Sequence, residues 1–154
     1  MPTYAAGTDV PSDKSRTEIE KTLTRWGADS FAYMASRTQA QVGFEYQGKR
    51  IRFTLPLPDR DSREFTLTPT GKERARNAAE QAYEQAVRQR WRALALVVKA
   101  KLEAVESGIS TFEQEFYAAI VLPDGRTLFE ATAPQVATAI ERGGRGPLTL
   151  ELEA

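Results

Sequence analysis

The sequence predicts an α+β fold, in which a small antiparallel β-hairpin or sheet packs on a long central α-helix with shorter covering helices. Residues 38–57 alternate apolar and polar side chains around a Gln47-Gly48 turn, which is typical of two paired strands. Residues 72–107 form one long helical stretch. A chain of 154 residues can bury a single core without metal or disulfide support. We therefore expect one domain over residues 15–142.

The N-terminal segment is predicted as a flexible arm followed by a short covering helix. Residues 1–14 are small and polar and are interrupted by proline and glycine, which favours an unordered arm. Ser15 and Glu18 then have the spacing of a capping box, which indicates a helix start. Ile19 and Leu23 give this helix one apolar face.

The predicted hairpin has one apolar and one polar face. In residues 49–57 the apolar side chains point one way, and Arg50 and Arg52 point the other way, because successive side chains in a strand alternate between faces. Residues 30–34 are a candidate third strand that carries Tyr33. The open face of the sheet would then hold two arginines near its centre.

The long helix changes character along its length. Its first half has only a thin alanine stripe, over Ala75–Ala86, whereas the residues from Trp91 to Val105 are apolar on nearly all sides. A helix that is apolar all round is normally buried. We therefore expect residues 91–105 to lie inside the fold, with the sheet and the other helices around them.

The C-terminal third is predicted to contain shorter elements. Ser110 and Glu113 have capping-box spacing, and Pro123-Asp124-Gly125 is a turn, either of a tight hairpin or of a loop between helices. A last helix is expected over residues 134–142, beginning at its proline. Residues 143–154 are predicted as a glycine-rich break followed by a C-terminal edge strand.

Composition excludes several kinds of chemistry. The chain has no cysteine and no histidine, so it has no thiolate nucleophile, no Cys-based metal site and no His general base. The acidic residues Asp59, Asp61 and Glu64 alternate with arginines that would repel a cation, so they predict a solvated loop. We therefore expect no enzymatic activity, no metal and no small-molecule cofactor. The N-terminus lacks a signal-peptide pattern and no apolar run spans a bilayer, so we expect a cytoplasmic protein without membrane contact.

Charge is unevenly distributed although the net charge is zero. Residues 1–71 carry +1, residues 72–101 carry +5 and residues 102–154 carry −6. Such a division of charge is typical of a protein that binds a polyanion, an oppositely charged protein or a second copy of itself. It is equally compatible with ion pairs formed within the chain.

The basic residues are the best candidates for a function. Arg88, Arg92 and Lys99 follow one helix stripe that can track a phosphate backbone, although Glu84 and Arg88 also have ordinary ion-pair spacing. On the hairpin, arginines beside an aromatic ring are typical of single-stranded nucleic-acid binding by stacking and phosphate contact. The predicted nucleic-acid interface consists of Arg50, Arg52, Arg88, Arg90, Arg92 and Tyr33.

Several segments carry a resemblance. They are GFEYQGKRIRF at 43–53 with LPD at 57–59, RWRAL at 90–94 with KAKLEAVESG at 99–108, and IVLPDGRT at 120–127. They resemble a family of small bacteriophage and prophage proteins, over most of residues 15–142. The resemblance implies a phage setting in the host cytoplasm, where small proteins without catalytic motifs serve DNA replication and recombination, virion assembly or host takeover. It implies no site residues.

Two functions follow as hypotheses. The leading one is a non-enzymatic phage accessory protein that binds nucleic acid, with single-stranded DNA as a candidate form, in replication or recombination. The alternative is a protein-interaction or assembly module without nucleic-acid binding. Its docking surfaces would be the alanine stripe of the long helix and the strand-like tail, and its partner a second copy, a host protein or a phage protein.

Overall fold

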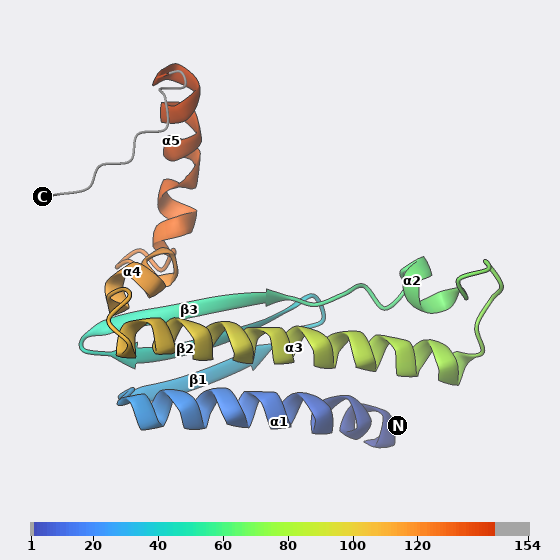
Figure 1. Ribbon diagram of the computed structural model, residues 1–154. Coiled ribbons are helices and arrows are strands. Elements are labelled where there is room, and N and C mark those ends of the chain that lie inside the picture. Colours follow the sequence, from blue (N-terminus) through green and yellow to red (C-terminus); the bar gives the residue numbers. More distant parts are fainter. Residues whose placement is uncertain (1, 144–154) are drawn as a thin grey trace, which may run out of the picture.

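A three-stranded antiparallel sheet, covered on one face by two long helices, forms the centre of the computed structural model (Figure 1). The structure describes the backbone of residues 2–143 and the side chains of residues 13–143. Its elements are α1 (Pro2–Trp26), β1 (Ser30–Ala35), β2 (Gln39–Tyr46), β3 (Lys49–Pro56), α2 (Arg63–Thr66), α3 (Arg76–Glu106), α4 (Phe112–Phe116), η1 (Tyr117–Ala119) and α5 (Leu128–Gly143). The predicted α+β class with a long central helix is confirmed.

The sheet follows the predicted alternation. Its strand order is β1-β2-β3, and Val42 in the central strand lies opposite Tyr33 on one side and Phe53 on the other. Gln47 and Gly48 both have positive φ, at 48° and 76°, as the two-residue turn of a tight hairpin requires. The hairpin and the candidate third strand are therefore confirmed.

The core lies between one face of the sheet and the helices α1, α3 and α4. Its buried side chains come from every one of these elements; they include Ile19, Leu23, Val42, Phe44, Ile51, Trp91, Val98, Leu102 and Phe116. Aromatic rings pack closely at the α4 end, where the centroid of Phe116 lies 4.5 Å from that of Phe112 and 5.7 Å from that of Phe44. α1 and α3 run side by side along the covered face of the sheet (Figure 1).

The prediction that residues 91–105 are buried on nearly all sides is wrong. α3 buries Trp91, Leu94, Val98 and Leu102 on one side only, while Leu96 remains 58% exposed on another. The reason is geometric, because the sheet, α1 and α4 all approach α3 from the same side. The first half of α3 is also less exposed than predicted, since Tyr83 and Val87 are buried.

The N-terminal segment also differs from its prediction. The sequence predicts a flexible arm over residues 1–14 and a helix start at Ser15, whereas α1 runs from Pro2 to Trp26. The neighbouring α3 provides a surface along which a longer helix can lie (Figure 1), and composition alone does not reveal that neighbour.

The C-terminal helix starts earlier than predicted. α5 begins at Leu128, six residues before Pro134, because Thr127 and Glu130 form a reciprocal capping box. The Pro123–Gly125 turn is a tight one, with Val121 bridged to Thr127, so of the two predicted forms the structure has the hairpin. The predicted glycine-rich break and edge strand lie outside the described residues, apart from Gly143, which is the last residue of α5.

Candidate nucleic-acid interface

The two hairpin arginines lie on the sheet face that points away from α1 and α3, as predicted, and both are engaged by other parts of the chain. Arg50 Nε donates to Glu45 Oε1 at 3.1 Å, across the strand pair. Arg52 Nη1 donates to the Gly125 carbonyl oxygen at 2.9 Å, and its Nη2 lies 3.4 Å from both carboxylate oxygens of Glu130. Arg52 therefore fastens the sheet to the turn that precedes α5, and its charge is partly neutralised there.

The turn that accepts Arg52 is itself held by local charge. Asp124 accepts hydrogen bonds from the backbone amide and the guanidinium of Arg126, at 3.0 and 2.9 Å. The backbone hydrogen bond, followed by the guanidinium, holds the pKa of the Asp124 carboxyl below its usual value. Asp124 thus stays ionised and keeps the turn in the shape that Arg52 contacts.

Tyr33 lies on the opposite face of the sheet from Arg50 and Arg52. It pairs with Val42, whose side chain is buried in the core, and its ring centroid is 5.5 Å from that of Trp91. The guanidinium of Arg16 lies over the Tyr33 ring, 4.0 Å from its centroid. The structure therefore does not bring Tyr33 together with the hairpin arginines, and one face of its ring is occupied by Arg16.

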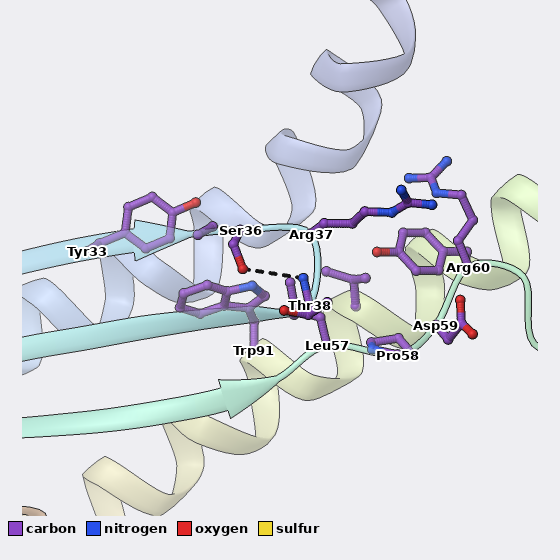
Figure 2. A pocket seen from close by; sticks show the side chains of 12 residues that line it. Tyr33, Ser36, Arg37, Thr38, Leu57, Pro58, Asp59, Arg60 and Trp91 are labelled. Atoms are coloured by element: carbon purple, nitrogen blue, oxygen red, sulfur yellow. Dashed lines mark hydrogen bonds between the residues drawn. The ribbon is translucent and has the colours of Figure 1, made fainter. Parts of the chain in front are cut away.

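Tyr33 also lines a cleft of about 670 Å³ between the β1–β2 turn, the segment after β3 and α3 (Figure 2). Figure 2 shows Arg37 and Arg60 at one end of this cleft and Tyr33 at the other. Arg60 Nη1 bonds Glu80 Oε1 at 2.6 Å, and its guanidinium lies 4.4 Å from the centroid of the Tyr83 ring. Arg60 is therefore already engaged by the chain, whereas Arg37 is exposed and lies 3.9 Å from Asp61.

The three α3 arginines of the predicted interface have different environments. Arg90 Nη1 donates to the Pro56 carbonyl oxygen at 3.1 Å and so ties α3 to the end of β3. Arg88 and Arg92 are exposed, and the structure shows no ion pair for either within residues 13–143. These two remain available to an outside anion.

A second group of free cations, which sequence reasoning missed, lies on α1. Lys14, Lys21 and Arg25 line a shallow groove of about 680 Å³ together with Lys99 of α3. The signal was present in the sequence, because spacings of seven and four residues place the three α1 cations on one side of a helix. Only the packing of α1 against α3 brings them beside Lys99.

We call this surface the α1–α3 basic face. It consists of six exposed residues: Lys14, Lys21, Arg25, Arg88, Arg92 and Lys99. Arg88 and Arg92 lie on the same side of α3 as Lys99, at spacings of four and seven residues along the helix. None of the six has an ion pair in the part of the chain whose side chains are described.

Two acidic residues also line the groove. Asp13 is paired with Arg16, which leaves Glu18 as the groove's other carboxylate. The hydroxyls of Thr17 and Thr22 are also at its wall, where Thr22 Oγ1 donates to the Glu18 carbonyl oxygen at 2.7 Å. The groove is therefore polar and cationic on balance.

The alanine stripe proposed as a docking surface is partly used inside the fold. Ala82 and Ala86 are half-buried against the core, while Ala75 and Ala78 are exposed. The predicted tail surface lies outside the described residues.

Among residues 2–143, no group of three or more His, Cys, Asp or Glu side chains is placed to hold a metal ion. Within the same part of the chain, no helix has the length and apolar content needed to cross a bilayer.

Comparison of the chain with known protein families, with curated proteins and with solved structures found no match. The resemblance to small phage proteins therefore stays a prediction.

Proposed function

We propose that this protein is a non-enzymatic accessory protein that binds DNA by phosphate contacts along the α1–α3 basic face. The observation that carries the proposal is the convergence of six exposed cations without ion pairs from two helices far apart in the sequence. The hairpin arginines Arg50 and Arg52 of the predicted interface are engaged by Glu45, Gly125 and Glu130, so we expect them to contribute less to DNA binding.

The physical basis is counterion release. Each Lys or Arg that neutralises a phosphate frees condensed cations from DNA, and this term drives binding without base recognition. Arg88 and Lys99 are separated by eleven residues, or about 16 Å along the helix axis. That length corresponds to about five steps of 3.4 Å along one DNA strand. The face is therefore long enough for several phosphate contacts at once.

The residues that line the groove between α1 and α3 include no aromatic ring for stacking. They are charged residues and threonines, and one face of the Tyr33 ring is occupied by Arg16. We therefore expect affinity without sequence preference. The sequence favours single-stranded DNA as the bound form, in a phage replication or recombination setting. Its affinity is therefore to be compared with that of duplex DNA of the same length.

Fluorescence anisotropy with labelled single-stranded and duplex oligonucleotides tests the proposal across a series of salt concentrations. We expect affinity to fall as salt rises, with a slope set by the number of phosphates contacted. Replacing Arg88, Arg92 and Lys99 together by glutamine should reduce the slope for a single strand by about two, since each contact contributes about 0.7.

The control is Lys72→Gln, which removes one positive charge from an exposed site outside the face. It should leave the slope within error of the unsubstituted protein. Absence of binding at low salt, or a triple variant that binds as tightly as the control, would overturn the proposal. Loss of binding in an Arg50→Gln, Arg52→Gln variant alone would move the site to the hairpin face.

A further inference from the structure

α5 exposes an apolar face that nothing in the described chain covers. No residue of this 16-residue helix is buried, and Phe129, Val136 and Ile140 are 63%, 53% and 61% exposed. Figure 1 shows α5 extending away from the sheet and from the two long helices. It is joined to the rest of the described chain at its first turn, through the Arg52–Glu130 pair and the Leu128 amide, which donates to the Ile120 carbonyl oxygen.

Such a helix is poorly suited to stand alone in water. Isolated helices of about 12–15 residues are marginal, so helices in proteins depend on packing of their apolar face. The ten residues from Ala131 to Ile140 carry no charge, whereas the outer surface of a solvated helix normally does. The composition of α5 therefore indicates that a partner covers it.

The apolar stripe has the spacing of a helix-pairing seam. Phe129, Ala133, Val136 and Ile140 follow one another at intervals of four, three and four residues, which are the a and d positions of a heptad. The flanking positions are occupied by Thr132, Ala137 and Ala139, apart from Glu130 at the start. Small uncharged flanks let a second helix approach closely without repulsion.

We propose that a second copy of this chain covers the face, through an antiparallel pairing of the two α5 helices. The stripe is self-complementary about its midpoint between residues 134 and 135. A two-fold axis there places Phe129 against Ile140 of the other copy, and Ala133 against Val136 of the other copy. Each of the four layers then contains one larger and one smaller side chain.

Helix dipoles favour the antiparallel direction. α5 has Glu130 in its first turn, and its last turn holds both Glu141 and Arg142, whose charges offset each other. In an antiparallel pair the first turn of one helix lies beside the last turn of the other, so opposite helix-dipole ends meet. A parallel pair would place like dipole ends together and Glu130 beside Glu130. The seam from Phe129 to Ile140 is about 17 Å long, which is short for a stable interface, so we expect a dimer of micromolar affinity.

Sedimentation velocity of the full chain, from about 5 to 500 μM protein, tests the dimer without DNA. We expect the weight-average mass to rise from monomer to dimer over this range. Val136→Glu places a charge in the seam at an exposed position, so it should leave the fold intact and keep the protein monomeric throughout. The matched control is Leu96→Glu, on the exposed side of α3, which should dimerise like the unsubstituted chain.

Introduced cysteines test the orientation, because the chain has none of its own. Ala133→Cys lies near the two-fold axis, so its thiols should be joined by a short bis-maleimide. Arg142→Cys would be about 22 Å from its counterpart along the axis and should not be joined. A monomer at the highest concentration, or a dimer that Val136→Glu leaves intact, would overturn the self-pairing. Efficient joining at position 142 would overturn its antiparallel direction.

Because these measurements contain no nucleic acid, their outcome is independent of the DNA-binding proposal. If the chain binds DNA through its basic face and stays monomeric, this result would refute only the proposed α5 pairing.

Discussion

A pair of identical substitutions in α3 measures how much of this helix is covered. Leu102 is 4% exposed and Leu96 is 58% exposed, although the two leucines lie only six residues apart. Leu→Ala removes three carbon groups, each worth about 0.8 kcal/mol when fully buried. Scaled by burial, the transfer term is about 2.3 kcal/mol for Leu102 and about 1 kcal/mol for Leu96.

The buried site has an additional cost. Truncating Leu102 leaves a cavity beside the other core side chains, which raises the expected loss to about 3 kcal/mol. Leu96 faces solvent, so its truncation leaves no enclosed cavity. Leu102→Ala should therefore lower the free energy of unfolding at least twice as much as Leu96→Ala.

Urea denaturation followed by circular dichroism at 222 nm checks this difference, with both variants measured at the same low protein concentration. Equal slopes of free energy against urea would show that the two transitions expose similar surface. A loss above about 2 kcal/mol for Leu96→Ala would refute the reasoning. It would mean that α3 is covered on both sides in solution, as its sequence alone suggests.

Two further predictions concern the segment that carries α5. Thr127→Ala removes the hydroxyl that accepts a hydrogen bond from the Glu130 amide, so the first α5 amides should exchange their hydrogens with solvent about fivefold faster, corresponding to about 1 kcal/mol. Thr127→Ser keeps the hydroxyl, so its amides should exchange at the rate of the unsubstituted chain. Equal exchange rates in the two variants would contradict the capping role. For Asp124, an NMR titration of the carboxyl carbon should give a midpoint below the usual value. Its depressed pKa contributes stability above the unfolded pKa, and this contribution is lost as pH falls through the folded pKa. The destabilisation caused by Asp124→Asn should accordingly be present at pH 7 and shrink in acid, and a midpoint at or above the usual value would count against the Arg126 contacts.

Local patterns predicted the elements whose causes are local. The hairpin depends on alternation along two adjacent strands and on a two-residue turn, all within residues 39–56. The α5 capping box is also a local pattern, Thr127 followed three residues later by Glu130, but the predicted helix begins at Pro134 and does not use it. This part of the helix start was therefore available in the sequence.

The candidate site was only partly predictable. Within residues 13–143, Arg88 and Arg92 are exposed and have no ion pair, as an interface needs, and Arg50 has the cross-strand partner that its register implies. The partners of Arg52 lie more than 70 residues away, at Gly125 and Glu130. No spacing rule connects residues at that distance, so the engagement of this arginine was visible only in the folded chain.

The sequence by itself determined the class of fold, the alternating faces of the sheet, the long helix and the absence of thiol and imidazole chemistry, because these depend on side-chain type and short-range periodicity. Tertiary structure decided which side of α3 is covered, which arginines are neutralised and which helices share the basic face. The physical reason is that burial and pairing depend on what lies across a contact. Leu96 and Leu102 are the same residue in the same helix, and only the packing of the sheet, α1 and α4 on one side of α3 makes one of them core and the other surface.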